Sequence, residues 1–436
     1  MRAARALPPA LSETLVAPGR ARCTFAPIAM VRGSAYLNRR LTTAALIAVL
    51  SVACRGKSSS THVPPDATTI LPQENPAGTV EVKAMFYGPM PTGVTVSRDN
   101  RIFVSFPRWG DPVEFTVAEV RDGGLYPFPN NQINQWPNGL PADKALISVK
   151  SIVLGPNNRL WALDTGNPRF EGVIDGGPKL VAIDPSSGSV IESIALPPTV
   201  ALPDSYLGDV RFDLRRGTRG LAFITDASMK GPNGIIVVDL ASGRSWRRLN
   251  DHPSTKADPR FIPFVEAREL WLRRPGKPRQ PFSVGANGLA LSPDGKRLYY
   301  SPLASRKLYA VSVDALVNES LPDSEVAKTV EDLGENGASS GLESDEQGHV
   351  YLTNYEHNAV MRRNADGTFE TLVHDSRILW PDTLCLAQDG WLYFTVNQLH
   401  RQPQFHNGHD ERVRPYALMR VKTNGRPVRL TTAPVL

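Results

Sequence analysis

Short apolar runs alternate with polar turns along most of this chain. The stretch GANGLALSPDGKRLYYSP, residues 285–302, has a small or polar start, an apolar run, a Pro-Asp-Gly turn and a second apolar run. This spacing predicts two short strands joined by a tight turn. Because an isolated hairpin is only marginally stable in water, the hairpin needs neighbours that cover its apolar face.

The same pattern occurs six times. The other five copies begin at residues 92, 151, 208, 340 and 381. Further strand-like runs lie between the copies, among them KLVAIDP, GIIVVDL and KLYAVSV, so each copy predicts a small antiparallel sheet. We therefore predict an all-β fold, a six-bladed β-propeller, as a single domain over residues 62–436. Residues 79–87 are expected to complete the last blade by pairing with the C-terminal strands.

The hairpin geometry predicts a functional surface, because the start of the first strand and the end of the second strand lie at the same rim. The residues at the starts are Thr92, Ser151, Asp209, Asn287, Ser340 and Asp382. Those at or just after the ends include Phe106, Arg108, Trp109, Asp164, Asp226, Asn354, Tyr355, Asn397 and His400. We expect a concave polar mouth with aromatic walls that binds a small molecule. Its carboxylates and rings suit a cationic amine or a metal ion. The alternative for each Asp or Asn is a local turn cap.

Several longer motifs resemble a known family. RIFVSFPRWGDPVEFTVAEV, LWALDTG and WPDTLCLAQDGWLYFTVNQLHR are similar to the major royal jelly protein/yellow family, over roughly residues 79–422. The resemblance implies a secreted six-bladed propeller linked to dopachrome conversion or to binding of small aromatic amines. For a tautomerase, the expected base is Asp209, Asp382 or His400. Arg108 would hold a substrate carboxylate or quinone oxygen, and Trp109 or Phe106 would stack on the ring.

A more distant resemblance is to the gluconolactonase/senescence-marker propellers, which hold a divalent cation with a Glu, an Asn and an Asp. Asn287 matches the Asn, whereas Thr92 and Ser340 occupy the two acidic places. Ca²⁺ or another divalent cation would then need Asp209 and Asp382 as carboxylate ligands. A metal-dependent lactonase is therefore one alternative function, and a non-catalytic binding or scaffold protein is another.

The charge of the chain is concentrated in its first residues. The net charge is +6, yet residues 62–436 hold 40 basic and 42 acidic side chains, which argues against a nucleic-acid partner. Within residues 1–61, Arg32, Arg39 and Arg40 precede an apolar run at 41–53 that is typical of an export signal. We expect an exported, periplasmic or extracellular protein. Met30 is a better-placed start, which would leave residues 1–29 untranslated.

Cys54 follows this apolar run in a setting that resembles a lipoprotein box, so membrane attachment is expected only through a lipid there; plain cleavage is the alternative. Of three cysteines only Cys385 lies in the predicted propeller, which rules out an intrachain disulfide there and favours a buried structural thiol. The insertion at 256–285 is expected to cross the rim or the outer face as a long loop. Its basic residues, Arg274 among them, are interpreted as a solvated face.

Overall fold

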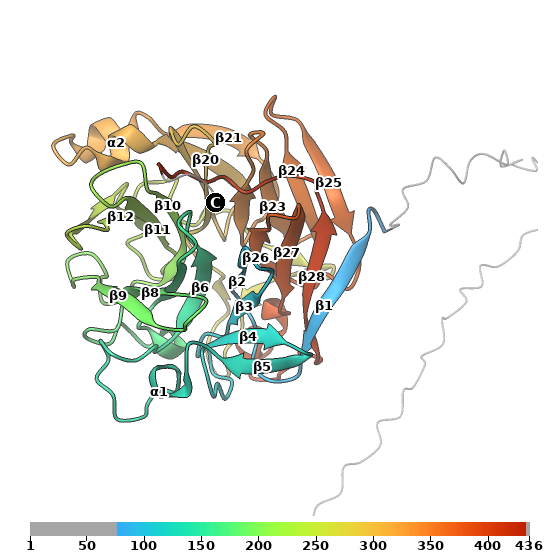
Figure 1. The fold of residues 1–436 in the computed structure, drawn as a ribbon. Helices are drawn as coiled ribbons and strands as arrows, with labels where there is room; N and C mark the ends of the chain where they lie inside the picture. Colours follow the sequence, from blue (N-terminus) through green and yellow to red (C-terminus); the bar gives the residue numbers. More distant parts are fainter. Residues whose placement is uncertain (1–75, 433–436) are drawn as a thin grey trace, which may run out of the picture. The chain divides into compact units, whose positions relative to one another are not determined.

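The computed structural model describes residues 76–432, which are built almost entirely of β-strands. Six four-stranded antiparallel sheets stand side by side in a ring (Figure 1). The prediction of an all-β, six-bladed β-propeller is therefore confirmed. The leader at 1–61, with Cys54, lies outside the described residues.

The first three blades follow one another along the chain. Blade 1 consists of β2 (Val94–Val96), β3 (Ile102–Ser105), β4 (Val117–Arg121) and β5 (Gly124–Pro127). Blade 2 consists of β6 (Val149–Leu154), β7 (Leu160–Asp164), β8 (Lys179–Ile183) and β9 (Val190–Ala195). Blade 3 consists of β10 (Leu207–Asp213), β11 (Leu221–Asp226), β12 (Gly234–Asp239) and β13 (Ser245–Arg248).

The last three blades complete the ring. Blade 4 consists of β18 (Ala286–Leu291), β19 (Arg297–Pro302), β20 (Lys307–Ser312) and β21 (Glu331–Glu335). Blade 5 consists of β22 (Leu342–Ser344), β23 (Val350–Asn354), β24 (Ala359–Arg363) and β25 (Phe369–His374). Blade 6 consists of β26 (Pro381–Leu386), β27 (Trp391–Val396), β28 (Tyr416–Lys422) and β1 (Val80–Phe86). The described helices are short: α1 (Asn131–Asn134), α2 (Val313–Val317), α3 (Asp323–Ala327) and three single 3₁₀ turns.

The N-terminal strand closes the ring. β1 pairs antiparallel with β28, from Val80 opposite Val421 to Phe86 opposite Tyr416. The expected pairing of residues 79–87 with the C-terminal strands is thus confirmed. Joining the two ends of the chain in one sheet gives blade 6 its fourth strand without a separate hairpin.

Glycines allow the innermost strands of neighbouring blades to approach closely. A Cβ atom on Gly341 would lie 2.3 Å from the carbonyl oxygen of Asp382 in the next blade. A Cβ on Gly288 would lie 2.9 Å from the backbone nitrogen of Leu342. The small residue at the start of a repeat is therefore required by contact between blades.

The innermost strands of four blades carry a β-bulge near the end where they begin. The pairing register shifts between Val149 and Ser151, between Leu207 and Val210, between Ala286 and Gly288, and between Pro381 and Leu384. The residues inside these shifts include Lys150, Asp209, Asn287 and Asp382. A bulge re-aims a side chain relative to the regular pleat. The bulges therefore bring a polar residue of each of these blades to the channel.

The insertion between blades 3 and 4 forms two small hairpins. One pairs β14 (Phe264–Val265) with β15 (Arg268–Glu269), and the other pairs β16 (Trp271–Leu272) with β17 (Gln280–Pro281). The insertion is held to the loop after β27, where the Arg273 nitrogen donates to the Gln404 carbonyl at 2.7 Å. The insertion therefore lies over the same rim of the propeller as the loop that follows β27 of blade 6.

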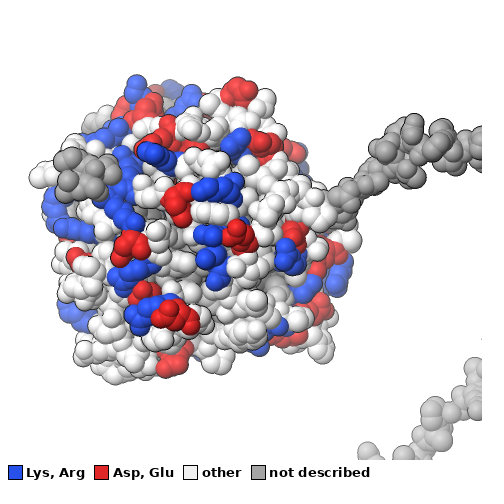
Figure 2. Space-filling view, turned by 45° about the vertical axis from the view of Figure 1, so that its right-hand side comes forward, with Lys and Arg blue, Asp and Glu red and all other residues white. Residues whose placement is uncertain are grey.

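Surface charge and helix length bear on whether a protein binds a polyanion or spans a membrane. Figure 2 shows basic and acidic side chains interspersed over the centre of the face in view. None of the helices in the described part of the chain is long and apolar enough to cross a membrane.

Candidate functional site

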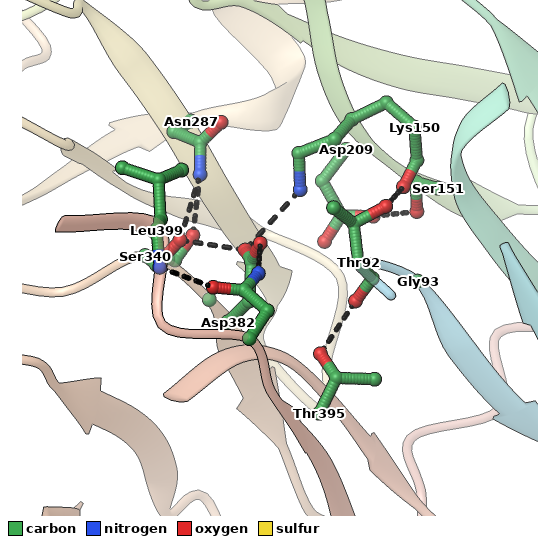
Figure 3. Close-up of polar contacts among 12 residues, drawn as sticks. Thr92, Gly93, Lys150, Ser151, Asp209, Asn287, Ser340, Asp382, Thr395 and Leu399 are labelled. Atoms are coloured by element: carbon green, nitrogen blue, oxygen red, sulfur yellow. Dashed lines mark hydrogen bonds and ion pairs between the residues drawn. The ribbon is translucent and has the colours of Figure 1, made fainter. Parts of the chain in front are cut away.

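A buried ion pair lies at the centre of the ring. Lys150 Nζ is 3.2 Å from Asp382 Oδ1, and the two side chains are 5% and 2% exposed (Figure 3). Asp382 also accepts hydrogen bonds from Ser340 Oγ at 2.6 Å and from Asn397 Nδ2 at 2.8 Å. The carboxylate thus accepts from three donors, and these bonds offset the free-energy cost of burying its charge.

The same network continues into blade 4. Asn287 Nδ2 donates to the Ser340 carbonyl at 2.6 Å (Figure 3). Lys150, Asn287, Ser340 and Asp382 all line one cavity of about 490 Å³. We call these four residues the polar floor. They come from blades 2, 4, 5 and 6, with Ser340 in the loop just before β22. The floor therefore exists only when the ring is closed.

Aromatic side chains form the walls of this cavity. Trp109 lies 5.6 Å from Phe170 and 6.2 Å from Tyr206 between ring centroids, and Phe170 lies 4.6 Å from Tyr206. The Trp109 indole nitrogen donates to the Tyr206 hydroxyl, and burial raises the pKa of that hydroxyl well above its usual range. Phe282 and Phe405 form a second, edge-on pair at 5.4 Å. Apolar walls over a polar floor are typical of a small-molecule site.

Two groups of the predicted mouth are structural rather than free. Asp164 accepts from the backbone nitrogens of residues 147 and 148 and lies 2.9 Å from Lys179 Nζ. Asp226 accepts from Ser205 Oγ at 2.5 Å and from Arg247 at 2.8 Å. Both carboxylates are fully buried and do not line the cavity. They act as turn caps with a salt bridge, the alternative that the sequence left open.

Asp209 is likewise already paired. It accepts from Ser151 Oγ at 2.5 Å and lies 2.9 Å from Arg211 NH1. Thr92 Oγ1 donates to the Lys150 carbonyl at 2.7 Å and so joins blades 1 and 2. Asp209, Ser151 and Thr92 stand on the channel beside the polar floor (Figure 3) but do not line the cavity.

Phe106 and Arg108 do not face the mouth. Phe106 is fully buried, with its ring edge-on to Phe86 at 5.6 Å. The Arg108 guanidinium donates to the carbonyls of Val113 at 2.7 Å and Asn134 at 3.1 Å. Burial lowers the pKa of Arg108, against the opposing charge of Asp164. Phe106 thus packs in the core and Arg108 holds a loop, so neither residue lines the cavity where a ring wall and a substrate donor were expected.

Asn354 and Tyr355 are buried beneath the rim. The Tyr355 hydroxyl donates to the Leu303 carbonyl at 2.6 Å, and its ring stacks on Trp380 at 4.0 Å. Asn354 packs against Gly337, and its Nδ2 lies 3.3 Å from Met361 Sδ. Neither residue lines the cavity. Asn397 is closer to the site, since it holds Asp382 and also donates to the Pro91 carbonyl at 3.0 Å.

His400 belongs to a neighbouring site. Its Nε2 lies 2.8 Å from Glu266 Oε2 of the insertion, and its ring stacks on Trp380. Burial lowers the pKa of His400, while the hydrogen bond to Glu266 opposes that shift. It lines a second cavity of about 460 Å³ with Glu266 and His406, and it does not line the cavity above the polar floor.

The residues considered for a channel cation do not fit one. Asp382 is neutralised by Lys150, and Asp209 by Arg211. Asn287 donates its amide group to Ser340, and Thr92 and Ser340 supply only hydroxyls. Among residues 76–432, no three His, Cys, Asp or Glu side chains come together as a metal-ligating group. The positive charge at the channel comes from lysine and arginine.

Several residues that line the cavity could not be recognised from the repeat pattern. Lys150 directly precedes a predicted first strand, where only the bulge turns it towards the channel. The others come from loops outside the repeat, including Phe170, Tyr206, Arg274, Phe282 and Phe405. Of these, only Arg274 and Phe282 lie in the insertion, whose basic residues are predicted to form a solvated face; that prediction is wrong for Arg274, which lines the cavity.

A family model described as major royal jelly protein matches residues 147–427, which include the polar floor and most of the walls. The chain belongs to the major royal jelly protein family. Major royal jelly protein 1 of Apis mellifera is 26% identical over 227 residues, or 49% of this chain and 48% of that protein. Protein yellow of Drosophila melanogaster is 28% identical over 236 residues, or 50% of this chain and 40% of that protein. The match thus spans half or less of these relatives' length.

Solved propellers resemble this major royal jelly protein family member more distantly. A putative gluconolactonase is 15% identical with a TM-score of 0.48, and the alignment covers 84% of this chain and 97% of that one. Regucalcin, a calcium-binding protein from Agrobacterium tumefaciens, is 14% identical with a TM-score of 0.48, covering 81% and 99%. Similarity of this degree says nothing about activity.

Proposed function

We propose that this protein binds a small aromatic molecule in the cavity above the polar floor. The observation that carries the proposal is the combination of five aromatic side chains with a buried, hydrogen-bonded floor around about 490 Å³. Cavities of roughly 300–1,000 Å³ are typical of small-molecule sites, in which a few fixed polar groups orient the ligand. A flat ring is favoured because the Trp109, Phe170 and Tyr206 rings already pack with one another at stacking distances.

Calorimetric titration with a neutral probe, indole-3-acetamide, tests this proposal. Wild-type protein is expected to bind it saturably, and Trp109→Ala is expected to weaken binding by about tenfold, the loss of one aromatic contact. Trp391→Ala is the matched control, because Trp391 is also partly buried but lies on β27 against Arg420, outside the cavity. Saturable binding that Trp109→Ala leaves unchanged would contradict the site.

Conversion of a dopachrome-type substrate is the second candidate. The Lys150–Asp382 pair favours it, because an ammonium and a carboxylate side by side on the floor of a pocket can move a proton to and from a bound ring. Asp382→Asn should then abolish dopachrome turnover while the probe still binds. The control is Asp389→Asn at an exposed turn. Binding without turnover in the wild type would leave the protein a non-catalytic binder.

We infer export from the same sequence features as before: three arginines, the apolar run at 41–53, and Cys54. Fractionation of cells that express the full chain tests it. A mature form recovered outside the cytoplasm is expected, with membrane association lost in Cys54→Ser if a lipid is attached. A full-length chain that stays in the cytoplasm would contradict export.

A further inference from the structure

We propose that the aromatic ligand carries a carboxylate, and that Arg274 binds it; this inference rests on the proposed function. The charges that line the cavity are unbalanced. Among residues 76–432, the cavity is lined by Lys150, Arg169, Lys230 and Arg274 but by one acidic residue, Asp382. A site with this lining favours an anionic ligand over the amine that the sequence suggested.

Three of the four cations already have a partner. Lys150 pairs with Asp382, as described above. Arg169 pairs with Glu171 at 2.9 Å, and Lys230 pairs with Asp204 at 2.6 Å. The three are therefore matched before any ligand binds.

Arg274 differs from them. Within residues 76–432, its guanidinium has no hydrogen bond or ion pair to another side chain or carbonyl. It is only partly exposed and lines the cavity. A partly desolvated cation without a counter-charge gains from an anion placed beside it, because the local dielectric is lower than that of water. The guanidinium fork matches a carboxylate in a bidentate arrangement.

The backbone before Arg274 is held firmly. The Arg273 nitrogen donates to the Gln404 carbonyl at 2.7 Å, and the Arg273 carbonyl accepts from Asn407 at 2.8 Å. Leu272 pairs with Gln280 across the hairpin. These bonds fix the place from which the Arg274 side chain reaches the cavity. Gln280, Gln402 and Gln404 line the same cavity, and Gln404 Nε2 donates to Gln402 Oε1 at 2.7 Å; each amide group keeps an N–H that can donate to a carboxylate.

For an amine ligand, the described lining offers no carboxylate that is still unpaired. Asp382, the one carboxylate that the described residues contribute to the lining, already receives hydrogen bonds from Lys150, Ser340 and Asn397. A cationic ligand would have to displace Lys150 from it and would meet the unpaired Arg274 charge as well. We therefore place the carboxylate of the ligand at Arg274 and its ring among the aromatic walls.

Three indoles that differ in charge test this by calorimetric titration at low salt: indole-3-acetate, the isosteric neutral indole-3-acetamide, and the cationic tryptamine. The wild-type protein is expected to bind the acetate at least about tenfold more tightly than the other two. Arg274→Gln should reduce acetate affinity to that of the acetamide and leave acetamide affinity unchanged. Arg273→Gln, at the adjacent exposed arginine outside this cavity, should change neither.

The outcomes separate the two proposals. Equal binding of the acetate and the acetamide, or tighter binding of tryptamine, would overturn the carboxylate inference and leave the aromatic site standing. A preference for the acetate that survives Arg274→Gln would also overturn it, since the anion would then be held elsewhere. Saturable binding of none of the three would contradict the proposed function and the inference with it.

Discussion

Lys150 and Asp382 are joined across the ring by an ion pair of 3.2 Å, although 232 residues separate them in the sequence. Lys150 lies on β6 of blade 2 and Asp382 on β26 of blade 6, so blade 1 lies between their blades. The pair therefore joins two strands that do not hydrogen-bond to each other. It supports the closed ring and the cavity floor together.

Removing one partner of this pair should be costly. Lys150→Met leaves a buried carboxylate without its cation, and we expect a loss of about 3–5 kcal/mol in the free energy of unfolding. The double variant Lys150→Met, Asp382→Asn should lose less than the sum of the two single variants, because the second change removes the stranded charge. Urea unfolding measures both. Lys230→Met is the control and should cost at most about 1 kcal/mol, as an exposed pair does; a similar loss in both lysine variants would contradict the role of the pair.

The close approach of blades 5 and 6 gives a second prediction. Gly341→Ala would place a Cβ atom 2.3 Å from the Asp382 carbonyl oxygen, so the strands must move apart. We expect about 1–3 kcal/mol of destabilisation by thermal or urea unfolding, together with weaker probe binding. Gly88→Ala, which meets nothing within 4 Å, should be within about 0.5 kcal/mol of wild type. Equal effects of the two substitutions would show that the blades are not in contact there.

The contact between the insertion and blade 6 should weaken in acid. The pKa of Glu266 is lowered mainly by the hydrogen bond from His400 and then by Arg401. The ionised Glu266 therefore adds to the free energy of unfolding above its ordinary pKa of about 4.5, and this stabilisation is lost as the pH falls below that value. The pKa of His400 is lowered by burial, so stability falls as pH drops below about 6.5. Both shifts act in one direction, because each lowers the stability of the folded chain as the pH falls.

Unfolding measured between pH 7 and pH 5 tests this. The free energy of unfolding of the wild type should fall with decreasing pH, and His400→Gln should reduce the slope. His357→Gln, at an exposed histidine, should keep the wild-type slope. A slope that His400→Gln does not change would contradict the assignment.

The single described cysteine should be inert in the folded chain. Burial, followed by the charge of Glu343, raises the pKa of the Cys385 thiol from 9.0 to about 11. With Cys23→Ser and Cys54→Ser in place, a thiol reagent at pH 8 should react about 100-fold more slowly with the native protein than with the urea-unfolded one, since the reactive thiolate is rare. Rapid native reaction would show that Cys385 is accessible.

The fold could be predicted from the sequence because each blade repeats one local pattern, and local patterns are what periodicity reports. The small residues at strand starts, such as Gly341, were visible as part of that pattern. The polar floor was visible in part, since Asn287, Ser340 and Asp382 stand at such starts.

The rest of the site depends on contacts that the repeat does not encode. Asp164 and Asp226 look like free rim carboxylates until their partners Lys179 and Arg247, which lie on other strands, are placed beside them. Lys150 reaches the channel through a bulge, which shifts the side-chain alternation by one residue. Phe282 and Arg274 come from an insertion whose path over the rim follows from tertiary hydrogen bonds alone.

The central claim is that the cavity above Lys150 and Asp382 binds an aromatic ring. A crystal structure of the protein with a brominated indole, located by the anomalous signal of bromine, tests it most directly. We predict one strong peak among Trp109, Tyr206 and Phe282, above the polar floor. A peak at the second cavity beside His400, or none in this cavity at a concentration that saturates binding in solution, would contradict the claim.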